Sequence, residues 1–283
     1  MSCSTIRMMT FPVSKYWRIF RVSLIERMVY RGDFLFGTLL RFLPMVTTIL
    51  LWHAVFEGSG QTELGSTVRY DLDQMLSYLL LVHISRAFSS MPGLAGGIAR
   101  SIRDGSLKKY LLQPIDMLGY LLTYRLAHKT AYIVTAALPY GILFYLCRHY
   151  FHLEHLDATT VAAYLAALGM AFVLGFYFES CIGCLGFWIL EVTSLLYVVN
   201  TLNFFVSGHM FPLDLLPPFW ATLLKALPFS YLAYFPAAVF LGKISGAALV
   251  KGLVIEVCWC VFFCLLSRVL YRIGLYRYSA FGG

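Results

Sequence analysis

Charged residues are scarce in this chain of 283 residues, of which 13% are charged and 60% are hydrophobic. An ordinary soluble domain carries about a quarter charged residues. The low charge content and several long apolar runs argue against a soluble globular fold and predict a polytopic membrane protein. No stretch between the apolar runs is long enough for a soluble domain, so residues 1–283 are expected to form one transmembrane domain.

Sequence motifs of nucleotide binding and hydrolysis are also absent. The chain has no Gly-x-x-x-x-Gly-Lys-Ser/Thr loop, which cradles nucleotide phosphates. It has no Gly-x-Ser-x-Gly elbow and no paired carboxylates at the end of an apolar run. We therefore predict that the chain is not an enzyme and binds no cofactor itself. If transport is driven by ATP, the ATPase is another polypeptide.

The N-terminus lacks the apolar core of a cleaved signal peptide, so the first span is expected to act as its own targeting signal. Met8 and Met9 are alternatives to Met1 as the first residue. The seven cysteines form no extracellular framework, because most lie inside apolar runs. Cys181 and Cys184 have the spacing of a redox or zinc pair, but no second pair follows at ligand spacing, which favours core packing.

Six apolar segments predict helical spans across a hydrocarbon core about 30 Å thick. Their expected bounds are 34–56, 76–91, 118–150, 160–189, 192–210 and 247–271. Residues 15–31, which mix apolar side chains with Lys and Arg, predict an interfacial helix on the inner leaflet. The predicted fold class is therefore an all-α membrane protein with six transmembrane helices.

A proline-rich apolar region occupies residues 211–242, with five of the chain's ten prolines at positions 212, 217, 218, 228 and 236. Proline interrupts helices, so the pieces are too short to span a bilayer. Broken backbone at membrane depth persists only where other protein or a watery cavity satisfies it. The region therefore predicts a re-entrant or interfacial helical hairpin.

A basic elbow occupies residues 92–114 between the second and third predicted spans. Leu94, Ile98 and Ile102 recur every four residues, which predicts a short amphipathic helix, with Gly105 just past its end. A second short turn is expected from Ser106 to just before Pro114. This is the most structured segment that the chain would show to the cytoplasm.

The distribution of Lys and Arg predicts the orientation. Thirteen lie in the N-terminal segment, the elbow and the tail from Arg268, against four in the opposite loops, namely Arg69, Arg148, Lys225 and Lys243. Positive residues concentrate on the cytoplasmic side of membrane proteins. Both termini and the elbow are thus predicted to be cytoplasmic. The net charge of +8 is explained by this topology in a lipid bilayer, so no nucleic-acid partner is predicted.

Polar residues inside the apolar runs are candidates for function. Glu179 and Glu256 lie in predicted spans, where a carboxylate is costly and usually faces the bundle interior or a water-filled path. Glu179 fits a substrate path or, equally, a structural pair with Arg86, Arg41 or a partner subunit. Asn200 and Asn203, three residues apart, fit the same path or bonds between helices.

A polar loop predicted on the outer side carries His149, His152, Glu154 and His155. Two histidines three residues apart can share a metal ion on a helix. A solvated loop explains the same residues more simply, so we predict no metal site.

Three features together resemble the membrane subunits of type-2 ATP-binding-cassette (ABC) exporters, in particular the small six-span permeases that work with a separate ATPase. They are the amphipathic segment 15–31, the elbow motif IRDGSLKKYLLQPID, and the proline-patterned stretch SGHMFPLDLLPPFWATLLKALPFSYLAYFPAAVFLG. The third is the most specific, because membrane physics does not require its proline pattern.

The resemblance implies a dimer of this chain with itself or with a homologous permease, seated on two ATPase subunits that bind ATP and Mg²⁺. It implies that the elbow is the coupling helix, which contacts the ATPase through Arg100, Ile102, Arg103, Asp104, Gly105, Leu107, Lys108 and Lys109. The expected function is export of an amphipathic or hydrophobic substrate (drug, toxic cation, lipid or glycan) through the inner or plasma membrane. The alternatives are an ion-coupled carrier or channel that uses Glu179 and Glu256, and a polytopic lipid-modifying enzyme.

Overall fold

The computed structural model describes residues 13–29, 31–60, 63–64, 69–151, 157–189 and 192–278. Helices dominate these residues, as the sequence predicts. They are α1 (Val13–Val29), α2 (Arg31–Ser59), α3 (Leu72–Ser89), α4 (Leu94–Arg103), α5 (Lys108–Leu111), α6 (Met117–Leu146), α7 (Ala158–Cys184), α8 (Thr193–Val206), α9 (Pro218–Ala226), α10 (Tyr234–Phe240) and α11 (Gly246–Arg277). Short 3₁₀ turns cover Arg148–Tyr150, Leu185–Phe187, Leu213–Leu215 and Pro228–Leu232.

A two-residue antiparallel ladder joins β1 (Glu63–Leu64) to β2 (Tyr70–Asp71) in the loop after α2. The purely helical prediction missed this ladder. Two residues per strand are too few to leave an alternating pattern in the sequence.

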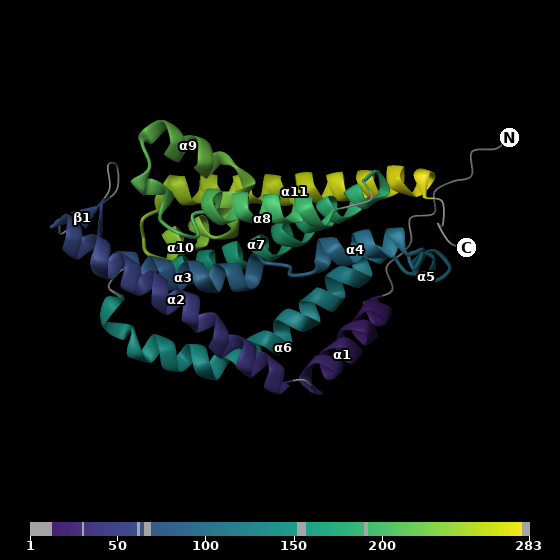
Figure 1. Ribbon diagram of the computed structural model, residues 1–283, viewed down its shortest axis with the longest axis horizontal. Helices are drawn as coiled ribbons and strands as arrows, with labels where there is room; N and C mark the ends of the chain where they lie inside the picture. Colours follow the sequence, from purple (N-terminus) through teal and green to yellow (C-terminus); the bar gives the residue numbers. More distant parts are fainter. Residues whose placement is uncertain are drawn as a thin grey trace.

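Most long helices run roughly along the long axis of the molecule (Figure 1). The elements β1 and α9 lie at one end, and the elbow helices α4 and α5 lie at the other. The loops predicted to be external and the segment predicted to be cytoplasmic are therefore separated by the length of the helical bundle.

Among the described residues, three helical segments are long and apolar enough to cross a membrane: Met117–Leu146, Ala158–Phe187 and Gly246–Arg277. Shorter apolar helical segments cover Phe42–Gly58 and Thr193–Val206. The third and fifth expected spans end earlier than predicted, because a 3₁₀ turn begins at Arg148 and the chain leaves α8 at Ser207. The total of six spans stays a prediction.

Helix α7 lies at the centre of the bundle and packs against α3, α4, α10 and α11. Gly175 allows the closest approach, since a Cβ atom there would lie 2.0 Å from the carbonyl oxygen of Ser89 at the end of α3. Small residues at such contacts let helix backbones approach closely in membrane proteins. Helix α3 is consequently fixed against α7 just where the elbow begins.

The proline-rich region forms the short helices α9 and α10 joined by 3₁₀ turns, in agreement with the expected broken hairpin. Its anchor is the buried carboxylate of Asp214, which accepts hydrogen bonds from Tyr70 (2.8 Å) and Tyr234 (2.9 Å) and pairs with Lys225 (2.5 Å). Burial, followed by the nearby Asp214 charge, raises the pKa of the Tyr70 hydroxyl far above its usual value. This network joins the β ladder to the hairpin.

Candidate coupling site and transmembrane pocket

The elbow folds into a helix, a glycine turn and a second short helix. Gly93 precedes α4 in the left-handed conformation (φ 74°), and Gly105 adopts the same conformation (φ 72°) just after α4 ends, as predicted. Leu94, Ile98 and Ile102 are buried, at 2%, 2% and 6% exposure. The four-residue repeat therefore correctly identified the face that holds the elbow to its own chain.

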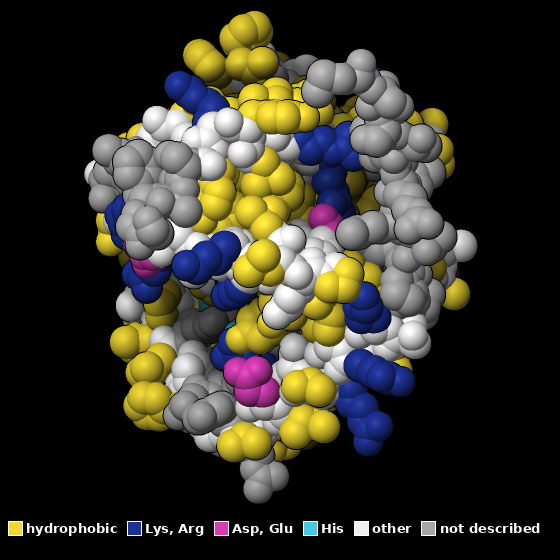
Figure 2. Space-filling model, turned by 90° about the vertical axis from the view of Figure 1, so that its right-hand side faces the viewer, with side chains coloured by type: hydrophobic (Ala, Val, Ile, Leu, Met, Phe, Trp, Pro, Cys, Tyr) yellow, Lys and Arg dark blue, Asp and Glu magenta, His cyan; other side chains and the backbone are white. Residues whose placement is uncertain are grey.

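The residues predicted to contact an ATPase divide into two groups. Ile102, Gly105 and Leu107 are buried, whereas the exposed ones are Arg100, Arg103, Asp104, Lys108 and Lys109. Figure 2 views the end of the molecule that carries α4 and α5 and shows far more Lys and Arg than Asp and Glu on it. The exposed part of the elbow is thus a basic surface on a helix whose apolar face is already occupied.

Helix α4 rests directly on the backbone of α7. A Cβ atom on Gly183 would lie 2.8 Å from Cβ of Ile98 and 3.0 Å from the Ala95 carbonyl oxygen. One turn on, a Cβ atom on Gly186 would lie 3.0 Å from Cα of Ala99. Contacts this short leave no room for side chains, so α4 packs directly against the backbone of α7 and of the turn that follows it.

Two charged side chains lie at the helix ends on either side of Gly93, namely the C-terminus of α3 and the N-terminus of α4. The Lys129 ammonium of α6 donates to the carbonyl oxygens of Ala87 and, at 2.8 Å, Ser90, at the end of α3. The Glu179 carboxylate of α7 lies where the backbone N–H of Ala95, in the first turn of α4, acts on it. A cation at a helix C-terminus and an anion at a helix N-terminus both complement the helix dipole. The start of the elbow is thereby fixed to α6 and α7.

The far end of the elbow is fixed to the first and last helices. Asp116 caps α6 through the Gly119 N–H (2.7 Å), and its other carboxylate oxygen pairs with Arg268 of α11 at 2.6 Å. Lys15 of α1 donates to the Pro114 carbonyl oxygen at 3.1 Å. The elbow is therefore held at both ends by charged side chains from other helices.

A groove of about 390 Å³ lies between α4 and the start of α8. Its α4 side carries Gly93, Gly96 and Gly97 together with Arg100 and Arg103, and its other side carries residues 192, 193 and 196. The two arginines predicted to meet an ATPase therefore border a hollow.

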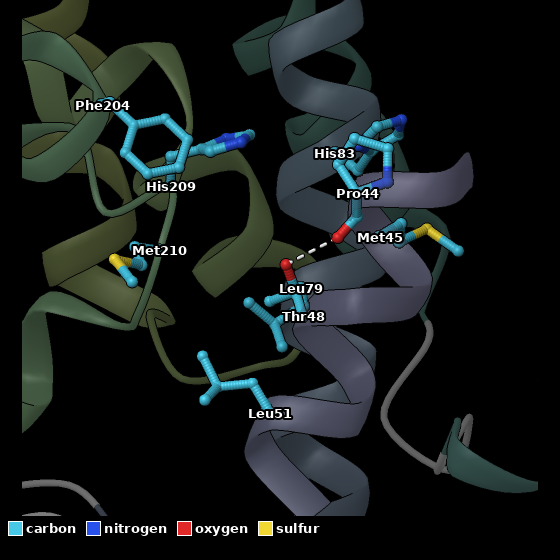
Figure 3. A pocket seen from close by; sticks show the side chains of 9 residues that line it. All are labelled: Pro44, Met45, Thr48, Leu51, Leu79, His83, Phe204, His209 and Met210. Carbon is cyan, nitrogen blue, oxygen red and sulfur yellow. Dashed lines mark hydrogen bonds between the residues drawn. The ribbon is translucent and has the colours of Figure 1, made fainter. Parts of the chain in front are cut away.

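A second pocket lies between α2, α3 and the segment that follows α8, and it encloses about 130 Å³. Figure 3 shows Phe204 and His209 on one side and His83 on the other. The lining residues are Pro44, Met45, Thr48, Leu51, Leu79, His83, Phe204, His209 and Met210. The Thr48 hydroxyl donates to the carbonyl oxygen of Pro44 itself at 2.8 Å, one helical turn back along α2.

The polar residues predicted for the substrate path are placed apart from this pocket. Glu179 lies under α4, where the charges of Arg86 and Arg125 act on it. Asn203 is buried, with its side-chain oxygen unpaired among the described residues, whereas Asn200 is exposed. Glu256 is fully buried in α11, and both its carboxylate oxygens lack a partner in the part of the chain that the structure describes.

The remaining candidates are cysteines and histidines. Cys181 and Cys184 are free thiols in the core, as the sequence predicted. His149 is exposed in the 3₁₀ turn after α6, while His152, Glu154 and His155 lie outside the described residues. Within the described ranges no cluster of three or more His, Cys, Asp or Glu side chains is arranged to hold a metal ion.

Sequence reasoning missed Lys129 as the cap of α3, the Asp116–Arg268 pair and the two pocket histidines. A lysine inside an apolar run was a signal for the first, since a cation there needs acceptors. The others depend on contacts between residues far apart in the chain, 152 positions in the case of Asp116 and Arg268.

The long apolar helices indicate a multi-pass membrane protein. A family model described as "ABC-2 family transporter protein" matches residues 42–282. The chain belongs to the ABC-2 transporter family and is a membrane permease rather than a catalytic subunit. Permeases of this family generally work with a separate ATPase subunit. No curated protein matches the chain.

Proposed function

We propose that this chain is the permease subunit of an ATP-driven exporter in the inner or plasma membrane. It moves an amphipathic or hydrophobic substrate, such as a drug, toxic cation, lipid or glycan, out of the cell. A separate ATPase binds ATP and Mg²⁺ and supplies the energy. Membership of the ABC-2 family and the architecture of the elbow support this proposal.

The observation that carries the proposal is the way the elbow is fixed. Its apolar face is buried and its basic face is exposed, so it offers a preformed contact to a cytoplasmic partner. Closure of two nucleotide-binding subunits is a rigid-body movement, and a stiff helix can transmit it. In our proposal Arg100 and Arg103 meet the ATPase, and the close contact of α4 with Gly183 and Gly186 passes the movement to α7.

The proposed assembly is a dimer of this chain with a second copy or with a homologous permease, seated on two ATPase subunits. Each chain has six spans and both termini in the cytoplasm. Long apolar faces support this arrangement, since α2 and α11 leave many large hydrophobic side chains exposed. Lipid would cover part of these faces and the other permease the rest. Glu179, Asn200 and Asn203 stay predicted residues of the substrate path.

Co-purification tests the proposal. The full chain is solubilised from its native membrane, its partners are identified by mass spectrometry, and ATP hydrolysis by the complex is measured. The proposal predicts an ABC ATPase in the complex, and the presence or absence of a second permease distinguishes the two kinds of dimer. Recovery of the chain alone, without ATPase activity, would contradict the exporter and favour the carrier or enzyme alternatives.

A further inference from the structure

We propose that the pocket between α2, α3 and the end of α8 is a substrate subsite that takes one neutral or anionic aromatic group and rejects cations. This inference rests on the proposed export function and narrows its substrate class. It identifies a site that contains none of the polar residues predicted from the sequence.

The size of the pocket limits what it holds. An engineered protein cavity of about 150 Å³ binds benzene. At about 130 Å³ this pocket takes a single ring or a short branched hydrocarbon, and the rest of a larger substrate stays outside. The pocket is therefore a recognition point for one end of an amphiphile.

The lining favours an aromatic group. The imidazole of His209 lies beside the Phe204 ring, with ring centroids 4.6 Å apart. Two methionines, Met45 and Met210, also line the pocket. Methionine sulfur and aromatic edges make favourable contacts with an inserted ring and adapt to its outline.

The charges around the pocket select against a cation. Among the described residues no Asp or Glu lines it, and the ionisable ones in the lining are the histidines His83 and His209. The positive charge of Arg86, one helical turn from His83 on α3, acts on His209. Glu179 is the acidic residue that acts on Arg86, and it lies outside the pocket lining. A bound ammonium would lose its hydration and find no carboxylate in the described lining to pair with.

A hydrogen-bonding group remains available for the polar end of the ligand. The Nδ1 atom of His209 is buried and has no partner among the described residues. A buried imidazole nitrogen can donate or accept according to its tautomer, and an unpaired one costs free energy. A hydroxyl or carboxylate on the ring would satisfy it, which explains why the subsite takes both neutral and anionic rings.

The test uses the full chain in lipid nanodiscs without any ATPase. Three probes share one ring: 4-(trifluoromethyl)benzyl alcohol, 4-(trifluoromethyl)phenylacetate and 4-(trifluoromethyl)benzylammonium. Saturable binding is measured by ¹⁹F NMR at pH 7, after subtraction of the signal from empty nanodiscs. The native chain should bind the alcohol and the carboxylate at least about tenfold more tightly than the ammonium.

Two variants locate the binding. His209→Glu should reverse the preference, so that the ammonium gains and the carboxylate loses about tenfold. Leu51→Trp fills the mouth of the pocket and should abolish saturable binding, whereas Leu50→Trp, on the same helix but outside the lining, should not. Both leucines are exposed, so these two variants remain informative even where His209→Glu does not fold.

Equal binding of the three probes to the native chain, or binding that survives Leu51→Trp, would overturn the subsite. Because no ATPase is present, these results are independent of the co-purification. If the probes bind as predicted but no ATPase co-purifies, the chain is another kind of transporter. If an ATPase co-purifies but the probes do not bind as predicted, the exporter proposal stands and only the subsite is wrong.

Discussion

The two carboxylates inside the bundle have opposite environments. The charges of Arg86 and Arg125 and the backbone N–H of Ala95 act on Glu179, whereas the Glu256 carboxylate has no partner among the described residues. An unpaired buried polar group lowers stability by about 1–3 kcal/mol, and a paired one does not. Glu256 therefore lowers the stability of the folded chain, whereas Glu179 raises it.

We expect Glu256→Met to raise the thermal unfolding midpoint in detergent by a few degrees, because it removes an unsatisfied group and keeps the volume. Glu179→Met should lower the midpoint, because it removes the negative charge that acts on the two buried arginines Arg86 and Arg125. Intrinsic fluorescence during heating measures both. A lower midpoint for Glu256→Met would show that Glu256 has a partner, for instance across a dimer.

Lys129 is the second residue on which the elbow depends. Lys129→Met should destabilise the chain by about 2 kcal/mol or more, since hydrogen bonds from a charged group to the Ala87 and Ser90 carbonyl oxygens are lost. Lys251→Met, an exposed position on α11, is the control and should leave the unfolding midpoint unchanged. Equal midpoints for the two variants would contradict the capping role.

At the scale of elements, the contact between α4 and α7 depends on glycine. Gly183→Ala should push α4 away from α7, because its Cβ would lie 2.8 Å from Ile98. Gly169→Ala on the same helix meets nothing within 4 Å. We therefore expect a lower unfolding midpoint for Gly183→Ala and an unchanged or slightly higher one for Gly169→Ala. Equal midpoints would mean that α4 is free to shift.

The exposed face of the elbow makes a different prediction. Arg103→Glu alters an exposed side chain whose ion pair with Asp104 (3.6 Å) is also exposed, so insertion and the unfolding midpoint should be unchanged. In membrane vesicles with the ATPase, the variant should hydrolyse ATP without export, because the basic contact to the partner is lost. Export at the native rate would remove Arg103 from the coupling contact.

The sequence predicted features that depend on residues close together in the chain, and it missed features that depend on contacts between distant residues. The burial of Leu94, Ile98 and Ile102 follows from a local repeat, and the broken hairpin follows from proline, so both were predictable. The cap from Lys129, the position of Glu179 beside α4 and the pocket around His209 arise when helices distant in the chain meet. Glu179 and Glu256 looked alike in the sequence because each is a lone carboxylate in an apolar run.

At the scale of the whole molecule, the chain has two chemically distinct ends. One carries the proline-rich hairpin held by Asp214, and the other carries the basic elbow (Figure 1). Helix α7 packs against both α4 and α10 and therefore connects them. In the proposed exporter, α7 is therefore the helix through which a movement of the elbow would reach the opposite end.

Site-specific photo-crosslinking in native cells tests this account most directly. A photoreactive residue is placed at position 103 in the elbow. The control carries it at exposed position 251, near the N-terminus of α11. Crosslinked partners are identified by mass spectrometry. The account predicts an ABC ATPase crosslinked from position 103 and none from position 251. No ATPase from position 103, or equal amounts from both positions, would contradict it.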